Sequence, residues 1–110
     1  MLSLRPDDFL GAKLVDSRDI LAVFYASWCP FCRSFLKIFE DTMTKKTTPS
    51  GALVDISDES NPLWEALNVN VVPTLVGFRD GEAIARKDGI SGAGLNISDL
   101  EDALRKMGKD

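Results

Sequence analysis

Hydrophobic side chains change their spacing near residue 30, and the change predicts a strand that leads directly into a helix. Six apolar residues, rich in β-branched and aromatic types, occupy positions 20–25, as in a strand buried on both faces. After residue 30, apolar side chains recur at helical spacing and polar ones take the opposite face. The apolar set is Cys32, Phe35, Leu36, Phe39 and Met43.

Turn and cap residues divide the rest of the chain into short elements. Pro6, Asp7 and Asp8 suit the first turn of a helix, because proline and acidic side chains are favoured there. The dipeptide Asp80-Gly81 is a strong signal for a hairpin turn between two strands. We expect strands at 2–4, 52–56, 71–78 and 82–87, helices at 6–15 and 61–67, and loops at 45–51 and 89–96.

The short middle helix and the last helix have recognisable beginnings. Asn61 and Pro62 supply a cap and a first residue for the helix at 61–67, in which Trp64 is expected to fill the core. Ser98 and Glu101 have the spacing of a capping box for the last helix. Strands that alternate with helices predict an α/β fold, with a mixed central sheet flanked by helices on both faces. We expect one domain over residues 1–110.

Composition restricts the kind of partner. The chain is 45% hydrophobic and 27% charged, which is enough for one modest core. Its net charge of −4 and its lack of a basic cluster argue against nucleic acid, because a phosphate-binding surface needs clustered cations. No apolar stretch approaches the roughly 20 residues that span a bilayer. We therefore expect a soluble, cytoplasmic monomer with no membrane partner.

The chain has only two cysteines, Cys29 and Cys32, and they lie where the strand meets the helix. Pro30 suits the first helical position, so Cys29 is expected to be the N-cap. The unpaired N–H groups and the dipole of the helix then favour a thiolate over a thiol. Cys32, one turn later, is near enough to form a disulfide and is expected to be the more covered sulfur. The pattern indicates a dithiol/disulfide redox centre.

Two other interpretations of the cysteines are weaker. A structural zinc site takes four Cys or His ligands and a catalytic one usually takes three, yet the chain has no histidine and no third cysteine. Only a site shared between subunits or completed by carboxylates would remain, so we expect no metal. Inert buried thiols are disfavoured because Trp28 and Pro30 are typical of an exposed rim rather than of core filling.

Three segments give the chain a resemblance to the thioredoxin family over nearly its whole length. They are FYASWCPFC at 24–32, VPTL at 72–75 and FRDGE at 78–82, in the order that the family has them. The resemblance implies a thioredoxin-like fold and a thiol–disulfide oxidoreductase that reduces protein disulfides. The Pro-Phe pair between the cysteines departs from the Gly-Pro of typical thioredoxins and is closer to the Pro-Tyr of glutaredoxins.

The resemblance also implies the roles of individual residues. Cys29 would be the nucleophile and Cys32 the resolving cysteine. Pro73 would follow a cis peptide bond, and Val72 before it would pair with an extended substrate through its main chain. The implied electron donor is a flavin- and NADPH-dependent enzyme of the thioredoxin-reductase type, and no cofactor of the chain's own is implied. The implied substrate-binding surface comprises Trp28, Pro30, Val72, Pro73, Gly89 and Ile90.

Two departures from the family pattern keep alternatives open. Thioredoxins usually hold a buried acid six positions before the first cysteine, where this chain has Val23, which we expect in the middle of the sheet beneath the sulfurs. A family lysine is also replaced near Ala52 or Leu53. The first alternative is a glutaredoxin-like, glutathione-linked or more oxidising enzyme, although the segment after Pro73 lacks the Gly-Gly of glutathione-binding glutaredoxins. The second is a redox-inactive interaction module on the same fold.

Overall fold

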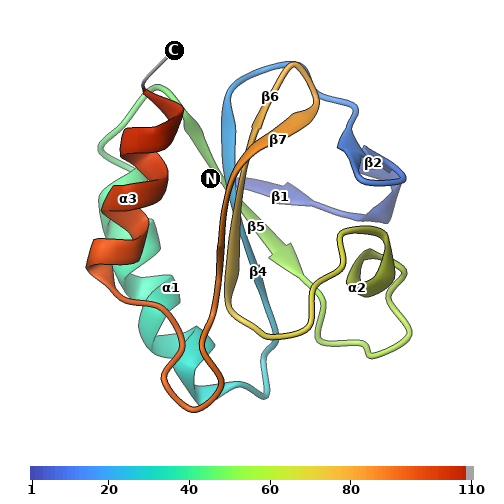
Figure 1. The fold of residues 1–110 in the computed structure, drawn as a ribbon, viewed down its shortest axis with the longest axis vertical. Coiled ribbons are helices and arrows are strands. Elements are labelled where there is room, and N and C mark those ends of the chain that lie inside the picture. The colour runs from blue at the N-terminus through green and yellow to red at the C-terminus, as the bar shows by residue number, and fades with distance from the viewer. Residues whose placement is uncertain (109–110) are drawn as a thin grey trace.

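A five-stranded mixed sheet forms the centre of the molecule in the computed structural model, which describes residues 1–108 (Figure 1). Its order is β1-β5-β4-β6-β7, in which β1, β5 and β4 are parallel and β6 and β7 are antiparallel to their neighbours. Residues 109 and 110 of the predicted domain lie outside the described part. The strands are β1 (Leu2–Leu4), β4 (Ile20–Tyr25), β5 (Ser50–Asp55), β6 (Thr74–Arg79) and β7 (Glu82–Asp88).

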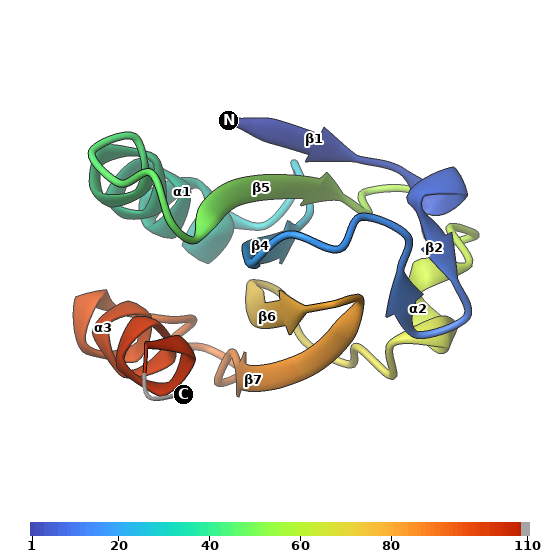
Figure 2. The same ribbon diagram turned by 90° about the horizontal axis from the view of Figure 1, so that it is seen from above.

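Helices cover both faces of the sheet, as predicted (Figure 2). Helices α1 (Pro30–Met43) and α3 (Ile97–Met107) lie together on one face. The short helix α2 (Leu63–Ala66) and a small two-stranded sheet lie at the other. Alternate residues of β4 enter two different core clusters, because successive side chains of a strand point to opposite faces. Strand β4 is therefore buried on both faces, which confirms the prediction from its apolar run.

The predicted helix at 6–15 is wrong. The chain makes one 3₁₀ turn at Pro6–Asp8, followed by a hairpin of β2 (Phe9–Leu10) and β3 (Lys13–Leu14). Phe9 and Leu14 are buried and Leu10 is exposed, so the apolar side chains follow strand alternation rather than a helical stripe. Gly11, with φ of +61°, takes the left-handed turn between the two strands, which side-chain-bearing residues rarely adopt.

Several element boundaries also differ from the predictions. Strand β5 begins at Ser50, within the expected loop at 45–51, and β6 begins only at Thr74. Helix α3 is capped by Asn96 rather than Ser98, with the Asn96 side chain accepting from the Asp99 N–H at 3.1 Å. Asparagine caps a helix as well as serine does, so the sequence offered two equivalent starts. The Asp80-Gly81 hairpin is confirmed, and both residues have positive φ.

Candidate active site

The two cysteines lie where β4 delivers the chain to the first turn of α1. Cys29 is the N-cap, and its Sγ accepts a hydrogen bond from the backbone N–H of Cys32 at 3.2 Å. Pro30 is the first helical residue, as predicted. The buried side chains of α1, which include Phe35 and Phe39, fix this helix against the sheet. The sequence thus places the Cys29 sulfur at the N-terminus of a helix that is packed firmly against the sheet.

The two sulfurs differ in accessibility. Both cysteines are free thiols; Cys29 is 6% exposed and Cys32 is 0% exposed. The Cys29 thiol donates to the backbone carbonyl of Val72, with Sγ 3.6 Å from the oxygen. The Val72–Pro73 peptide bond is cis, as the resemblance implied, and so is Thr48–Pro49. We call Cys29 the outer cysteine and Cys32 the inner one. The outer sulfur therefore faces the main chain immediately before Pro73.

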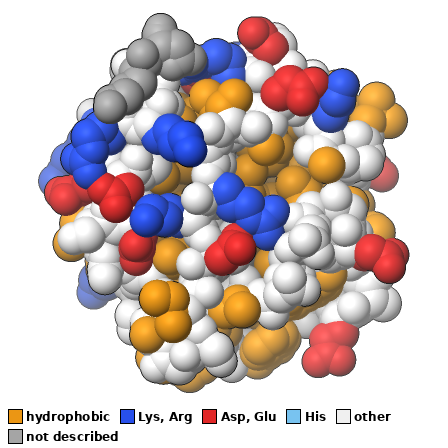
Figure 3. Space-filling view, viewed as in Figure 1, with side chains coloured by type: hydrophobic (Ala, Val, Ile, Leu, Met, Phe, Trp, Pro, Cys, Tyr) orange, Lys and Arg blue, Asp and Glu red, His pale blue; other side chains and the backbone are white. Residues whose placement is uncertain are grey.

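An apolar rim surrounds the outer sulfur. A shallow groove runs past Cys29 between the first turn of α1 and two backbone segments, 70–72 and 90–92. Three of the large side chains beside it remain exposed, namely Trp28 at 55%, Phe31 at 42% and Ile90 at 67%. Figure 3 shows apolar side chains over the first turn of α1 and the loop that follows β7. The predicted residues Trp28, Pro30, Val72 and Ile90 all line this groove.

Pro73 and Gly89 lie directly behind the groove. Strand β6 begins just after Pro73, and the Gly89 N–H donates to the hydroxyl of Thr74 at 3.5 Å. A methyl group added at Gly89 would collide with the backbone carbonyl oxygen of Pro73. Glycine at this position lets the two backbone segments approach closely. The structure therefore brings all the predicted site residues together at one end of the sheet.

Sequence reasoning missed Phe31 and Trp64 as residues of the groove. Trp64 was predicted to be in the core, and it does pack, half-buried, against the core cluster, but it also lines the groove. Its indole N–H donates to the carbonyl of Ile56 at 2.9 Å. Phe31 packs against the loop after β7, since a methyl group at Gly94 would lie only 2.8 Å from the Phe31 Cβ. The departure of the Pro-Phe pair from the family motif was the available signal for Phe31.

No group of three or more His, Cys, Asp or Glu side chains within residues 1–108 is arranged to hold a metal ion. None of the helices in this part of the chain is long and apolar enough to cross a membrane.

Comparison with known proteins agrees with this geometry. The thioredoxin family model matches residues 2–105. The chain belongs to the thioredoxin family. Thioredoxin of Mycolicibacterium smegmatis is 28% identical over 105 residues, which cover 94% of each chain. Thioredoxin of Mycobacterium bovis is 31% identical over 102 residues, which cover 90% of this chain and 85% of that protein. As a member of this family the chain is a thiol–disulfide oxidoreductase.

Solved thioredoxin structures have the same fold. Thioredoxin f2 of Chlamydomonas reinhardtii superposes with a TM-score of 0.80 at 20% identity, covering 100% of this chain and 98% of that one. A second neighbour comes from a complex of ferredoxin:thioredoxin reductase with thioredoxin f2 and has a TM-score of 0.75 at 20% identity, with 94% of this chain and 91% of that chain covered. These likenesses confirm the predicted thioredoxin-like fold.

The inner sulfur is held in its protonated form. Burial, followed by its hydrogen bond with Cys29, raises the pKa of Cys32 from an ordinary value of 9.0 to about 12. A thiolate at this position would lose its hydration without gaining a positive partner. The inner cysteine of this family member therefore needs a proton acceptor before it can attack.

The residue that replaces the family acid packs in a different core cluster from the two cysteines. Val23 is fully buried in the middle of the sheet, as expected, and packs in the cluster that contains Phe35 and Phe39. Both cysteines belong to the other cluster, with Phe24 and Ala26. The part of the prediction that placed Val23 beneath the sulfurs is therefore not confirmed. Its neighbours on β4 point to the cluster that holds the cysteines.

The reduced protein should become less stable as the pH rises from about 9 to about 12 because of Cys32. In this range the unfolded thiol loses its proton while the folded one keeps it, so the unfolded state binds fewer protons and gains population. The measurement is the free energy of unfolding under reducing conditions at about pH 8 and about pH 11.

The matched control for this prediction is Cys32→Ala. Tyr25, whose pKa burial also raises, is present in both proteins and contributes to the loss of stability in each. Wild type should lose more stability than the variant over the same interval. An equal loss would contradict the raised pKa of Cys32.

Proposed function

We propose that the protein reduces disulfides in other proteins through Cys29 as nucleophile and Cys32 as resolving cysteine. The Cys29 thiolate attacks one sulfur of the substrate disulfide and expels the other as a thiolate, which takes up a proton. Cys32 then loses its proton and attacks the Cys29 sulfur of the mixed disulfide. The substrate leaves with two thiols, and the protein keeps a Cys29–Cys32 disulfide, so two electrons have moved to the substrate.

The observation that carries this proposal is the contact between the Cys29 sulfur and the Val72 carbonyl, 3.6 Å apart. A substrate strand that pairs with the main chain at Val72 would bring its own cysteine to this sulfur. Main-chain pairing tolerates many sequences, as a general reductant of proteins requires. The apolar rim of Trp28, Phe31 and Ile90 supports a polypeptide substrate better than a small polar disulfide.

The oxidised protein must be returned to the dithiol by an electron donor. A neighbour structure contains thioredoxin f2 together with ferredoxin:thioredoxin reductase. We propose a donor of the thioredoxin-reductase type for this chain as well. Within this proposal the protein acts as a monomer in the cytoplasm, where a pool of reductant keeps dithiols reduced. It uses no cofactor of its own, since the two sulfurs carry both electrons.

Reduction of insulin by dithiothreitol tests the proposal. The protein at catalytic concentration should accelerate precipitation of the released insulin chain, because Cys29 reacts faster than free dithiothreitol. The turbidity is followed with and without the protein, and a Cys29→Ser, Cys32→Ser double variant serves as the control. Precipitation at the rate of dithiothreitol alone would favour a redox-inactive interaction module instead.

A further inference from the structure

One arginine of β7 contacts residues that lead into both backbone segments bordering the sulfur of Cys29. The guanidinium of Arg86 donates to the backbone carbonyls of Leu67 at 2.6 Å and Asn68 at 2.8 Å. Its Nε donates to the carboxylate of Asp88 at 2.6 Å. The side chain is 34% exposed, so much of its length is covered.

The first two partners of Arg86 lie at the end of α2. Leu67 closes this four-residue helix, and Asn68 leaves it with a positive φ of 52°. The Val69 N–H turns back to the carbonyl of Trp64 at 2.8 Å, which completes a Schellman-type end. The chain then runs through residues 70–72 along the groove to the cis bond before Pro73.

The third partner of Arg86 leads to the opposite border of the groove. Asp88 is the last residue of β7, and Gly89 and Ile90 follow it directly. The guanidinium of Arg86 therefore joins the turn that leads into segment 70–72 to the carboxylate of the residue that leads into segment 90–92.

A guanidinium suits this position for physical reasons. The carbonyls at the end of a helix carry partial negative charge, and a helix of four residues has little stability of its own. Arginine presents several N–H donors in a rigid planar fork, whereas lysine offers one compact ammonium. Lysine could keep the charge but could not reach all three acceptors in one geometry.

We propose that Arg86 is a positioning residue for the reaction with protein disulfides. It holds segment 68–72 at the distance from Asp88 at which the Val72 main chain can pair with a substrate strand. This inference rests on the proposed function and concerns the substrate groove, not the reactivity of Cys29. Its loss should weaken capture of an extended polypeptide while sparing small disulfides that need no strand pairing.

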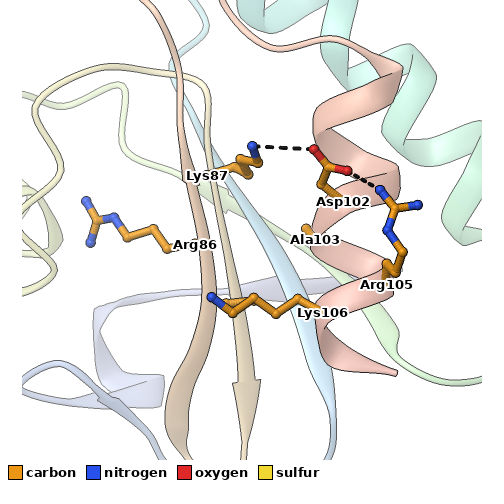
Figure 4. A pocket seen from close by; sticks show the side chains of 7 residues that line it. Arg86, Lys87, Asp102, Ala103, Arg105 and Lys106 are labelled. Carbon is orange, nitrogen blue, oxygen red and sulfur yellow. Dashed lines mark hydrogen bonds and ion pairs between the residues drawn. The ribbon is translucent and has the colours of Figure 1, made fainter. Parts of the chain in front are cut away.

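The neighbouring lysine provides a matched control. Arg86 and Lys87 extend to opposite sides of β7, and Lys87 faces α3, where it lies 3.5 Å from the carboxylate of Asp102 (Figure 4). Loss of either side chain removes one positive charge from the same strand. Only loss of Arg86 frees the residues that lead into the two groove segments.

The experiment compares two substrates for wild type, Arg86→Met, Arg86→Lys and Lys87→Met. Insulin with dithiothreitol gives kcat and KM for a protein disulfide, and the pre-reduced proteins with 5,5′-dithiobis(2-nitrobenzoate) give the rate for a small one. Both Arg86 variants should lose about tenfold in kcat/KM for insulin, mainly through KM, and stay within about twofold for the small disulfide. Lys87→Met should keep both rates.

The possible outcomes separate this inference from the proposed function. Equal losses on both substrates, or no loss on insulin, would overturn the positioning role while leaving the redox function intact. Failure of Arg86→Lys to fold would also overturn it, because the residue would then be needed for the fold itself. Wild type that does not reduce insulin would overturn the proposed function and this inference with it.

Discussion

Cys29→Ser should abolish disulfide reduction, whereas Cys32→Ser should react once with each substrate and remain attached to it. The difference follows from the position of Cys29 as the N-cap of α1, facing the groove, and the complete burial of Cys32. Without the inner thiol the mixed disulfide has no partner to resolve it. The trapped species should appear as a band of higher mass on non-reducing electrophoresis and disappear with dithiothreitol.

Alkylation provides an independent check of the same assignment. Iodoacetamide reacts with thiolates, so in the reduced protein Cys29 should be modified well before Cys32, whose raised pKa keeps it protonated. Peptide mass spectrometry after short exposures gives the two rates. Modification of both cysteines at equal rates would contradict the assignment of Cys29 as nucleophile.

Val23→Asp should destabilise the protein by about 3–5 kcal/mol at neutral pH, because a charge would replace a methyl-bearing side chain in the dry centre of the sheet. Burial would raise the pKa of the new carboxyl. Below the pKa that the carboxyl has in the unfolded chain, it is neutral in both the folded and the unfolded state. The loss of stability should therefore be smaller at about pH 4 and grow as the pH rises toward the raised pKa of the folded state.

Denaturant unfolding at about pH 4 and about pH 7 measures this effect. Val23→Thr is the matched control, since it has nearly the same shape and no charge and should cost about 1–2 kcal/mol at both values. A pH-independent loss for Val23→Asp, equal to that of Val23→Thr, would mean that the position is hydrated. The outcome also tests whether this site could accept a family-type carboxylate at all.

The parts of the fold set by local patterns were predictable from the sequence. Three patterns are each compatible with only one local structure, and the structure contains all three. They are the apolar run of β4, the helical stripe of α1 and the Asp80-Gly81 turn. The cysteines were placed correctly for the same reason, because Pro30 fixes where the helix begins. The Pro73 conformation and the substrate groove came from the family resemblance rather than from the local pattern.

The failures occurred where distant contacts decide between local alternatives. Residues 9–14 could form a helix turn, but Phe9 packs its ring 6.2 Å from that of Phe24 and 6.0 Å from that of Phe78, and strand alternation permits both contacts. Trp64 does pack against the core as predicted, and only its additional place beside the groove was missed. Arg86 carried no sequence signal, since two of its three acceptors are backbone carbonyls 18 and 19 positions away.

The contact between Phe31 and Gly94 has a consequence for how the active-site motif can change. The second residue between the cysteines is wedged against the backbone of the loop after β7, at the point where Ile90 and Gly94 exchange two hydrogen bonds. A smaller side chain at position 31 would leave that loop without its support, and a side chain at position 94 would push Phe31 away. We therefore expect the dipeptide between the cysteines and the loop after β7 to change together among relatives. Replacing the dipeptide alone in this chain would disturb both the first turn of α1 and the loop that faces it.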